Sequence, residues 1–186
     1  VIPEKREKIR DIAGRGLKSL GTKLLGAIPF EPVMGCGTIE QIADEFKYTV
    51  ISGEKALSNR VEHIVIGAME AQNLLRHIKR NTLIITSGDR VDNILLAMAM
   101  VKHGETGGGS IAGLILTGGF RPQNSAVFFP LCHSGIPVLL DDEDTFTVSS
   151  KIKDHIFKIR AQDVEKIRTM PQLVSKYVDI EQIIAD

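Results

Sequence analysis

The sequence has 186 residues, of which 43% are hydrophobic and 25% charged, a composition typical of one globular domain or of one domain with a smaller attachment. Lys and Arg together number 23, as do Asp and Glu, so no net field draws the chain to nucleic acid or a membrane, and we expect neither as a partner. The two cysteines, Cys36 and Cys132, lack metal-ligand spacing, and no secretory leader or long apolar span precedes the domain. We therefore expect a cytoplasmic protein.

Hydrophobic periodicity divides the chain into three parts. Residues 1–36 are predicted to form a helix and a strand that end in a proline- and glycine-rich linker, residues 37–156 an α/β domain, and residues 157–186 a charged tail of one or two helices. Thr38 followed by Gln41 has the form of a capping box. The expected elements, in chain order, are the helix Glu4–Leu20, the strand Lys23–Pro29, the helix Thr38–Phe46, the strands Tyr48–Ser52 and Val61–Gly67, the helix Met69–Lys79, the strand Thr82–Thr86, the helix Asp89–His103, the strand Ile111–Leu116, the helix Pro122–Ser134, the strand Pro137–Leu140 and the helix Asp144–Ile156.

This alternation of strands and helices predicts the α/β class, with a mainly parallel sheet flanked by helices on both faces. The strands Thr82–Thr86 and Ile111–Leu116 are almost continuously apolar, as parallel strands buried on both faces are. The segment Glu105–Ser110, with three consecutive glycines, is predicted to be a loop. In the helix Met69–Lys79, the side chains expected to face inward are those of Ala71, Leu74, Leu75 and Ile78.

Two of the predicted strands end in polar and glycine residues. In open α/β sheets, ligands bind at the carboxyl ends of the strands, so we expect both ends to line one crevice. A guanidinium there is the natural partner of a carboxylate or phosphate, and glycine amides beside a hydroxyl can donate further hydrogen bonds. The candidate effector pocket consists of Ser87, Gly88, Asp89 and Arg90 after the first strand, and Thr117, Gly118 and Gly119 after the second.

Structural alternatives stand beside these assignments. Asp89 and Asp92 are placed where carboxylates cap a helix and favour its positive end. Arg90 could equally pair with an acid of the run Asp141–Asp144, which closes the next predicted strand. The Thr117–Gly119 stretch suits a tight turn with positive φ as well as a close approach to a ligand or another subunit.

Other motifs with known chemistry are incomplete. The stretch Gly16–Lys23 is similar to a P-loop, but it ends in Thr-Lys and precedes a predicted strand. His63 lies inside a strand, where a core or edge role is more common than a catalytic one, and Cys132 and His133 are neighbours on a helix and point in different directions. Dinucleotide, hydrolase and zinc-protease motifs are not found. We expect no catalytic residue, no metal and no cofactor.

Gly88-Asp89-Arg90 and Thr117-Gly118-Gly119 resemble the two halves of the signature that names the DRTGG domain family, and the resemblance covers about residues 37–150. Upstream, Lys5–Pro29 resembles the tail of a dethiobiotin-synthetase-like P-loop domain. Downstream, Asp144–Ile152 resembles the exit of the same region in long bacterial phosphate acetyltransferases, in which the catalytic domain follows. The resemblance implies that this chain corresponds to the middle of such a protein.

DRTGG domains also accompany the CBS pairs of some pyrophosphatases, and a related fold occurs in HPr kinase/phosphorylase; in these hosts the catalytic centre lies in another domain. The resemblance therefore implies a non-catalytic regulatory and oligomerisation module of a phosphate-acetyltransferase-like protein, with a small anionic metabolite or nucleotide as candidate effector. Two alternatives stay open: a nucleotide-binding protein or small enzyme that uses Asp89 and Arg90, and a purely structural dimer module. The apolar residues Phe120, Phe128 and Phe129 lead us to expect self-association.

Overall fold

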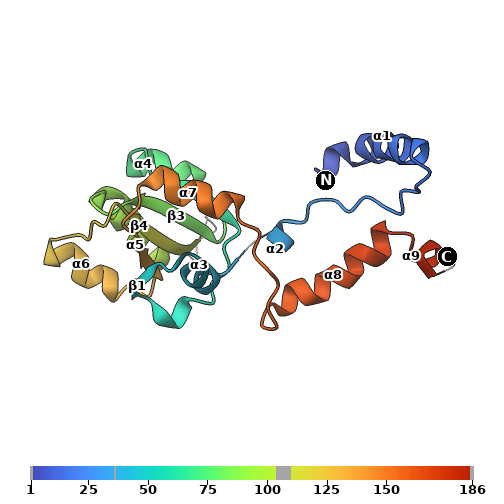
Figure 1. The fold of residues 1–186 in the computed structure, drawn as a ribbon. Helices are drawn as coiled ribbons and strands as arrows, with labels where there is room; N and C mark the ends of the chain where they lie inside the picture. The colour runs from blue at the N-terminus through green and yellow to red at the C-terminus, as the bar shows by residue number, and fades with distance from the viewer. Residues whose placement is uncertain (1, 36, 104–109, 185–186) are drawn as a thin grey trace. The chain divides into compact units, whose positions relative to one another are not determined.

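A five-stranded sheet forms the middle layer of the unit Cys36–Phe157 (Figure 1). The structure, a computed structural model, describes residues 2–35, 37–103 and 110–184. The strand order is β1-β5-β4-β3-β2. Four strands run parallel, and β1 pairs with β5 in the antiparallel direction. The strands are β1 (Thr49–Ser52), β2 (His63–Ile66), β3 (Thr82–Ser87), β4 (Ile111–Thr117) and β5 (Val138–Leu140).

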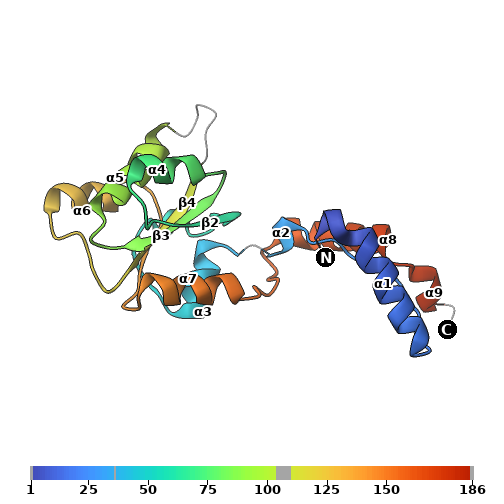
Figure 2. The ribbon, with the colours of Figure 1, turned by 90° about the horizontal axis from the view of Figure 1, so that it is seen from above.

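Helices cover both faces of this sheet, and each face has its own apolar cluster. Figure 2 shows α3 and α7 on one side of the strands and α4, α5 and α6 on the other. The predicted α/β class, with a mainly parallel sheet between two helical layers, is thus confirmed. The helices are α3 (Ile39–Phe46), α4 (Ala71–Leu74), α5 (Val91–His103), α6 (Ser125–Cys132) and α7 (Thr145–Asp154), with short 3-10 turns η2 (Glu54–Ala56) and η3 (Leu75–His77).

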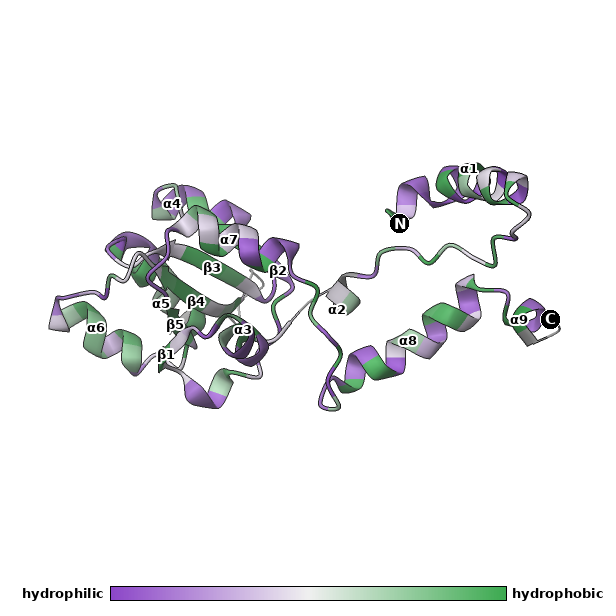
Figure 3. Ribbon diagram, viewed as in Figure 1, coloured by the Kyte–Doolittle hydropathy of each residue, from purple (hydrophilic) through white to green (hydrophobic). Residues whose placement is uncertain are grey.

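The central strands are buried because their sequences are apolar on both sides of the pleat. Every residue of β4 is buried, and so are the first five of β3, which Figure 3 shows as predominantly hydrophobic segments at the middle of the sheet. Ile39 and Val148 contribute to the cluster on one face, and Ile94 and Leu131 to the cluster on the other. Such double burial is characteristic of parallel strands between helical layers.

The predicted capping box is present at the start of α3. The Thr38 hydroxyl accepts a hydrogen bond from the Gln41 amide at 3.2 Å, and the Gln41 side chain accepts one from the Thr38 amide at 3.0 Å. Two otherwise unpaired amides are satisfied in this way, which fixes where the helix begins. Ile39 and Ile42 follow on the buried face of the same helix.

The predicted helix Met69–Lys79 is wrong in its extent. The α-helical part is only α4, and the next three residues form the 3-10 helix η3. The tighter 3-10 winding changes the angular phase of the side chains, so Leu75, expected to face inward, is 46% exposed. Leu74 and Ile78 are buried as predicted.

The polypeptide divides into two units. One comprises Cys36–Phe157, and the other joins Val1–Gly35 to Lys158–Asp186. The second unit holds the 3-10 helix η1 (Pro3–Lys5) and the helices α1 (Arg6–Ser19), α2 (Pro32–Gly35), α8 (Val164–Tyr177) and α9 (Ile180–Ile184). Cys36 and residues 105–109 of the predicted glycine-rich loop lie outside the described residues.

The predicted strand Lys23–Pro29 is not formed. Within the described residues of the second unit, a single bridge joins Gly26 to Val178, supported by a hydrogen bond of 2.8 Å from the Asp179 amide to the Leu25 carbonyl. The Arg6 guanidinium lies 4.5 Å from the centre of the Tyr177 ring, a cation–π contact. No apolar side chain of this unit, in its described part, belongs to the buried core.

Candidate functional site

The carboxyl ends of β3, β4 and β5 are joined by backbone hydrogen bonds. The Gly88 amide donates to the Thr117 carbonyl at 3.2 Å, which links the β3 end to the β4 end. The Gly118 amide donates to the Glu143 carbonyl at 2.7 Å, and the Gly119 amide to the Asp141 carbonyl at 2.9 Å, which links β4 to β5. The fold therefore brings Ser87–Arg90 and Thr117–Gly119 together at the carboxyl ends of neighbouring strands, as their positions after parallel strands predict.

The glycines at these strand ends permit backbone contacts that no side chain would allow. A Cβ atom on Gly88 would lie 1.8 Å from the Phe120 carbonyl oxygen. Gly118 and Gly119 have φ angles of +77° and +69°, and a Cβ on Gly119 would lie 2.8 Å from a carboxylate oxygen of Asp142. The tight turn predicted for these two glycines is therefore present, and close packing accounts for Gly88.

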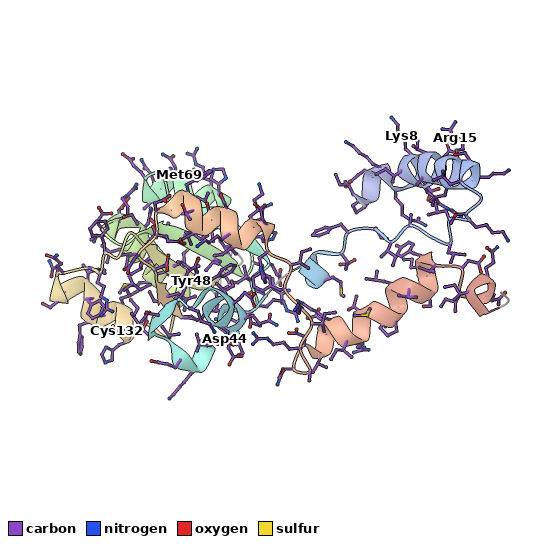
Figure 4. The ribbon with its side chains drawn as sticks, viewed as in Figure 1. Lys8, Arg15, Asp44, Tyr48, Met69 and Cys132 are labelled. Carbon is purple, nitrogen blue, oxygen red and sulfur yellow. The ribbon has the colours of Figure 1, made fainter. Side chains whose placement is uncertain are left out.

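Arg90 holds the first turn of α5 against the loop that follows β2. Its Nε donates to Asp92 Oδ1 and its Nη2 to Asp92 Oδ2, both at 2.9 Å. Nη2 also donates to the carbonyl of Met69 at 2.8 Å, and Nη1 to that of Ala68 at 3.4 Å; Met69 is labelled in Figure 4. The acid partner of Arg90 is thus Asp92 rather than a member of the Asp141–Asp144 run.

This pairing also sets the protonation of the two groups. The hydrogen bonds from Arg90 hold the pKa of the Asp92 carboxyl below its ordinary value, with smaller contributions from backbone amides. The same hydrogen bonds, made to a charged carboxylate, raise the pKa of Arg90 further above its usual range. The Arg90 side chain is 33% exposed, so the bidentate pair leaves part of the guanidinium open to solvent.

The remaining predicted residues have separate environments. Asp89 is exposed, and its carbonyl accepts the Val91 amide at 2.9 Å. Ser87 is half-buried, and its carbonyl accepts the Arg90 amide at 3.0 Å. The Thr117 side chain is buried and its hydroxyl lies 2.7 Å from that of Thr145. Asp89 supplies the only carboxylate among the seven predicted residues. This carboxylate faces solvent, and none of the described contacts gives it a role in the fold.

Sequence reasoning missed Asn93, a fully buried side chain in the first turns of α5. Its amide nitrogen donates to the Gly67 carbonyl at 2.9 Å and to the Thr86 hydroxyl at 3.3 Å. Together with Arg90, this group fixes the loop after β2 to the start of α5. A polar residue directly before the apolar run Ile94–Ala97 of a predicted helix was the only signal of such a role.

Two exposed aromatic rings flank the joined strand ends. Phe120 follows the glycine turn and is 53% exposed, and Phe146 lies in the first turn of α7 and is 77% exposed. Asp144 caps this helix by accepting the amides of Phe146 and Thr147 at 2.9 and 3.1 Å. Exposed phenylalanines lose solvent contact when a planar group or a second protein surface covers them.

Tyr48, labelled in Figure 4, directly precedes β1, whose first residue Thr49 pairs with Leu140 at the carboxyl end of β5. Its hydroxyl is buried and accepts or donates no hydrogen bond among the described residues. Burial raises the pKa of Tyr48, and the nearby carboxylates of Asp141 and Glu143 raise it further. Glu143 itself binds the Lys151 ammonium at 2.6 Å, so this end of the sheet carries several fixed charges.

No cluster of three His, Cys, Asp or Glu side chains suited to a metal is found within residues 2–35, 37–103 and 110–184. The P-loop-like stretch Gly16–Lys23 lies at the carboxyl end of α1, where free carbonyls rather than amides are presented. An open groove of about 770 Å³ borders this helix; its lining includes Arg10, Arg15 and Lys18, and Asp11 pairs with Arg15 at 2.9 Å. Figure 4 shows Arg15 and Lys8 projecting from α1.

In the described part of the chain, none of the helices combines the length and apolar character that crossing a membrane requires. The expected absence of a membrane partner rests on charge and composition and is still a prediction.

Comparison with known proteins gives relatives over most of the chain. Phosphate acetyltransferases from Salmonella typhimurium, Nitratidesulfovibrio vulgaris and Synechocystis sp. are 26%, 28% and 29% identical to it over 164, 158 and 163 residues. These matches cover 86%, 84% and 87% of this chain but only 22%, 22% and 23% of the relatives. The chain thus spans between a fifth and a quarter of the length of these enzymes.

A solved structure shares the fold. The CBS and DRTGG domains of the regulatory region of Clostridium perfringens pyrophosphatase, complexed with the activator diadenosine tetraphosphate, superpose with a TM-score of 0.51 at 17% identity, covering 82% of this chain and 74% of that one. The family model of the DRTGG domain matches residues 41–155, which include both strand-end motifs. The chain belongs to the DRTGG domain family.

Proposed function

We propose that this chain is a non-catalytic regulatory and self-associating module of a phosphate-acetyltransferase-like protein. Its membership of the DRTGG family, with relatives that are phosphate acetyltransferases, is the observation that carries the proposal. The pyrophosphatase region with the same fold is described as regulatory and was complexed with an activator. A cytoplasmic location belongs to the same proposal, as does the origin of residues 1–36 in a dethiobiotin-synthetase-like domain.

The proposed effector is a small anion, either a metabolite or a nucleotide, bound at Ser87–Arg90 and Thr117–Gly119. Asp92 holds the Arg90 guanidinium with two hydrogen bonds of 2.9 Å, so the cation is oriented before a ligand arrives. Its exposed part can then contact a carboxylate or phosphate. The exposed rings of Phe120 and Phe146 stand beside these loops and favour a nucleotide over a small carboxylate, because a base can stack on them.

Three donors assigned from the sequence contribute less in this conformation. The amides of Gly118 and Gly119 already donate to backbone carbonyls at 2.7 and 2.9 Å, and the Thr117 hydroxyl is within hydrogen-bond distance of Thr145. An incoming anion would therefore depend mainly on Arg90. These internal hydrogen bonds favour the second candidate function, a purely structural module in which the motif joins the strand ends. The enzyme alternative would have to rely on Asp89, because Asp92 is held by Arg90.

A thermal-shift screen separates these functions. Nucleotides, including diadenosine tetraphosphate, and central metabolites would be tested against the wild type, Arg90→Lys and a matched control, Arg80→Lys. Arg80 is 80% exposed and lies at the amino end of β3, away from the motif. A ligand at a hundred times its Kd stabilises a protein by about 2.7 kcal/mol. We expect such a shift in the wild type and in Arg80→Lys.

The same shift should be largely lost in Arg90→Lys, because lysine keeps the charge but cannot form the bidentate pair with Asp92 that orients the cation. An equal shift in Arg90→Lys would remove Arg90 from the site. If no ligand stabilises the wild type, the effector proposal fails and the structural module is favoured. Ligand-free melting curves of each variant serve as the folding control, since Arg90 also binds the carbonyls of Ala68 and Met69.

A further inference from the structure

The strand β2 forms an unprotected edge of the sheet. It is the last strand in the order β1-β5-β4-β3-β2 and pairs only with β3 among the described strands. The hydrogen bonds of His63 and Gly67 to the carbonyls of Asn81 and Ile85 point toward β3. Because successive residues of a strand point their backbone groups in opposite directions, the amides and carbonyls of Ile64 and Ile66 point away from the sheet.

The side chains on this edge are as unprotected as the backbone. Ile64 and Ile66 are 39% and 42% exposed, whereas Val65 packs against the apolar cluster under α4 and α5. Natural edge strands are commonly protected by short length, a lysine, a proline or a β-bulge. The strand His63–Ile66 is short, with four residues, but it contains neither lysine nor proline, and its register with β3 is regular. The opposite edge strand, β1, does carry a register irregularity, between Val50 and Ser52.

We infer that β2 pairs antiparallel with β2 of a second copy of this chain, with the twofold axis at Val65, so that two sheets join into one. This inference rests on the self-association in the proposed function and identifies its surface. The register follows from symmetry: Ile64 lies opposite the partner's Ile66, and each such pair exchanges two hydrogen bonds. The isoleucines of both copies then cover one another on the exposed face.

The charges along this edge also suit a second copy. In the same register Glu62 lies opposite Ala68 and His63 opposite Gly67, so no like charges meet across the axis. Glu62 already accepts a hydrogen bond from the Asn81 side chain at 2.8 Å, away from the edge. A surface that is complementary to itself is what a twofold interface requires. Phe120 and Phe129 are also exposed, at 53% and 65%. Their rings offer apolar area, but not the directional hydrogen-bonding groups that the backbone of an edge strand offers.

The register can be tested by a cross-link. The two Val65 residues would form a non-hydrogen-bonded pair, with Cα atoms about 4.5 Å apart, close enough for a disulfide. In a chain in which Cys36 and Cys132 are replaced by serine, Val65→Cys should form a covalent dimer on mild oxidation. The control Leu95→Cys, on the 46% exposed Leu95 of α5, should not. Equal cross-linking of both variants, or none of Val65→Cys, would overturn the register.

Sedimentation velocity between about 1 and 100 µM tests the surface itself, since weak homodimers dissociate in this range. We expect a wild-type dimer. Ile66→Pro removes one outward amide, a change that edge strands tolerate, and Ile64→Lys places a charge on the edge; each should raise the dimer Kd about tenfold or more. Leu95→Lys and Phe129→Lys are matched controls and should leave it unchanged. Circular dichroism checks that every variant is folded.

The outcomes separate this inference from the function on which it rests. Dimers that persist in Ile66→Pro and Ile64→Lys, or that dissociate in Phe129→Lys, would overturn the β2 interface while self-association stands. A wild type that stays monomeric throughout would overturn both the interface and the self-association. Neither result would affect the effector proposal, because the thermal-shift screen measures ligand binding independently of assembly.

Discussion

Gly88→Ala tests whether close backbone packing joins the strand ends. An added Cβ would lie 1.8 Å from the Phe120 carbonyl oxygen, whereas real Cβ contacts essentially never fall below 3.0 Å. The difference requires a displacement of about 1.2 Å between the β3 and β4 ends (3.0 minus 1.8 Å). Because the two atoms nearest to the added Cβ, the carbonyl oxygen and carbon of Phe120, belong to the backbone, no side chain can rotate to relieve the clash. Such overpacking costs about 3 kcal/mol, at the upper end of the usual range.

A second alanine variant separates this steric effect from conformational strain. Gly135 has a φ of +79°, and nothing lies within 4 Å of an added Cβ, so Gly135→Ala introduces strain alone and should cost about 1 kcal/mol. Urea unfolding of both variants, followed by circular dichroism, gives the two free energies. A loss for Gly88→Ala no larger than that for Gly135→Ala would refute the packing argument.

Three further substitutions follow from individual contacts. Thr38→Ala removes one half of the capping box with Gln41 and should lower the free energy of unfolding by about 1 kcal/mol in chemical denaturation. Asp92→Asn should weaken the link to Arg90 by less than about 1 kcal/mol, since both groups are partly exposed. The pKa of Asp92 is lowered in the folded state. Its carboxylate therefore contributes to the free energy of unfolding above the unfolded pKa of about 3.9, and this contribution is lost as the pH falls through the folded pKa. Plots of the free energy of unfolding against pH for the wild type and Asp92→Asn should therefore converge in acid. Tyr48→Phe removes a buried hydroxyl without a hydrogen bond among the described residues, so its melting temperature should equal or exceed that of the wild type.

The parts of the fold that could be predicted depend on local patterns. The apolar runs of β3 and β4 indicate strands buried on both faces, and the spacing of Thr38 and Gln41 indicates where α3 begins. The errors arose where a distant partner decides the structure. Residues 23–29 have strand-like composition, yet the only β-bridge they form in the described part of the unit joins Gly26 to Val178, and a single bridge does not make a strand.

The same distinction applies to the candidate site. The positions of Gly118 and Gly119 after a buried strand predict a turn, and both have positive φ. That their amides would be occupied by the carbonyls of Asp141 and Glu143 depends on the pairing of β4 with β5, which no local pattern reveals. The Arg90 contact with Asp92, only two residues away, was within reach of sequence reasoning.

The central claim, that an anionic effector binds at the joined strand ends, is tested most directly by mapping amide chemical shifts on adding the best ligand of the thermal-shift screen. We predict that saturable shifts concentrate at Ser87–Arg90 and Thr117–Gly119, and that Phe120 and Phe146 shift as well if the ligand carries a base. Shifts centred instead on the groove beside α1, or no saturable shifts with any ligand of the screen, would contradict the claim.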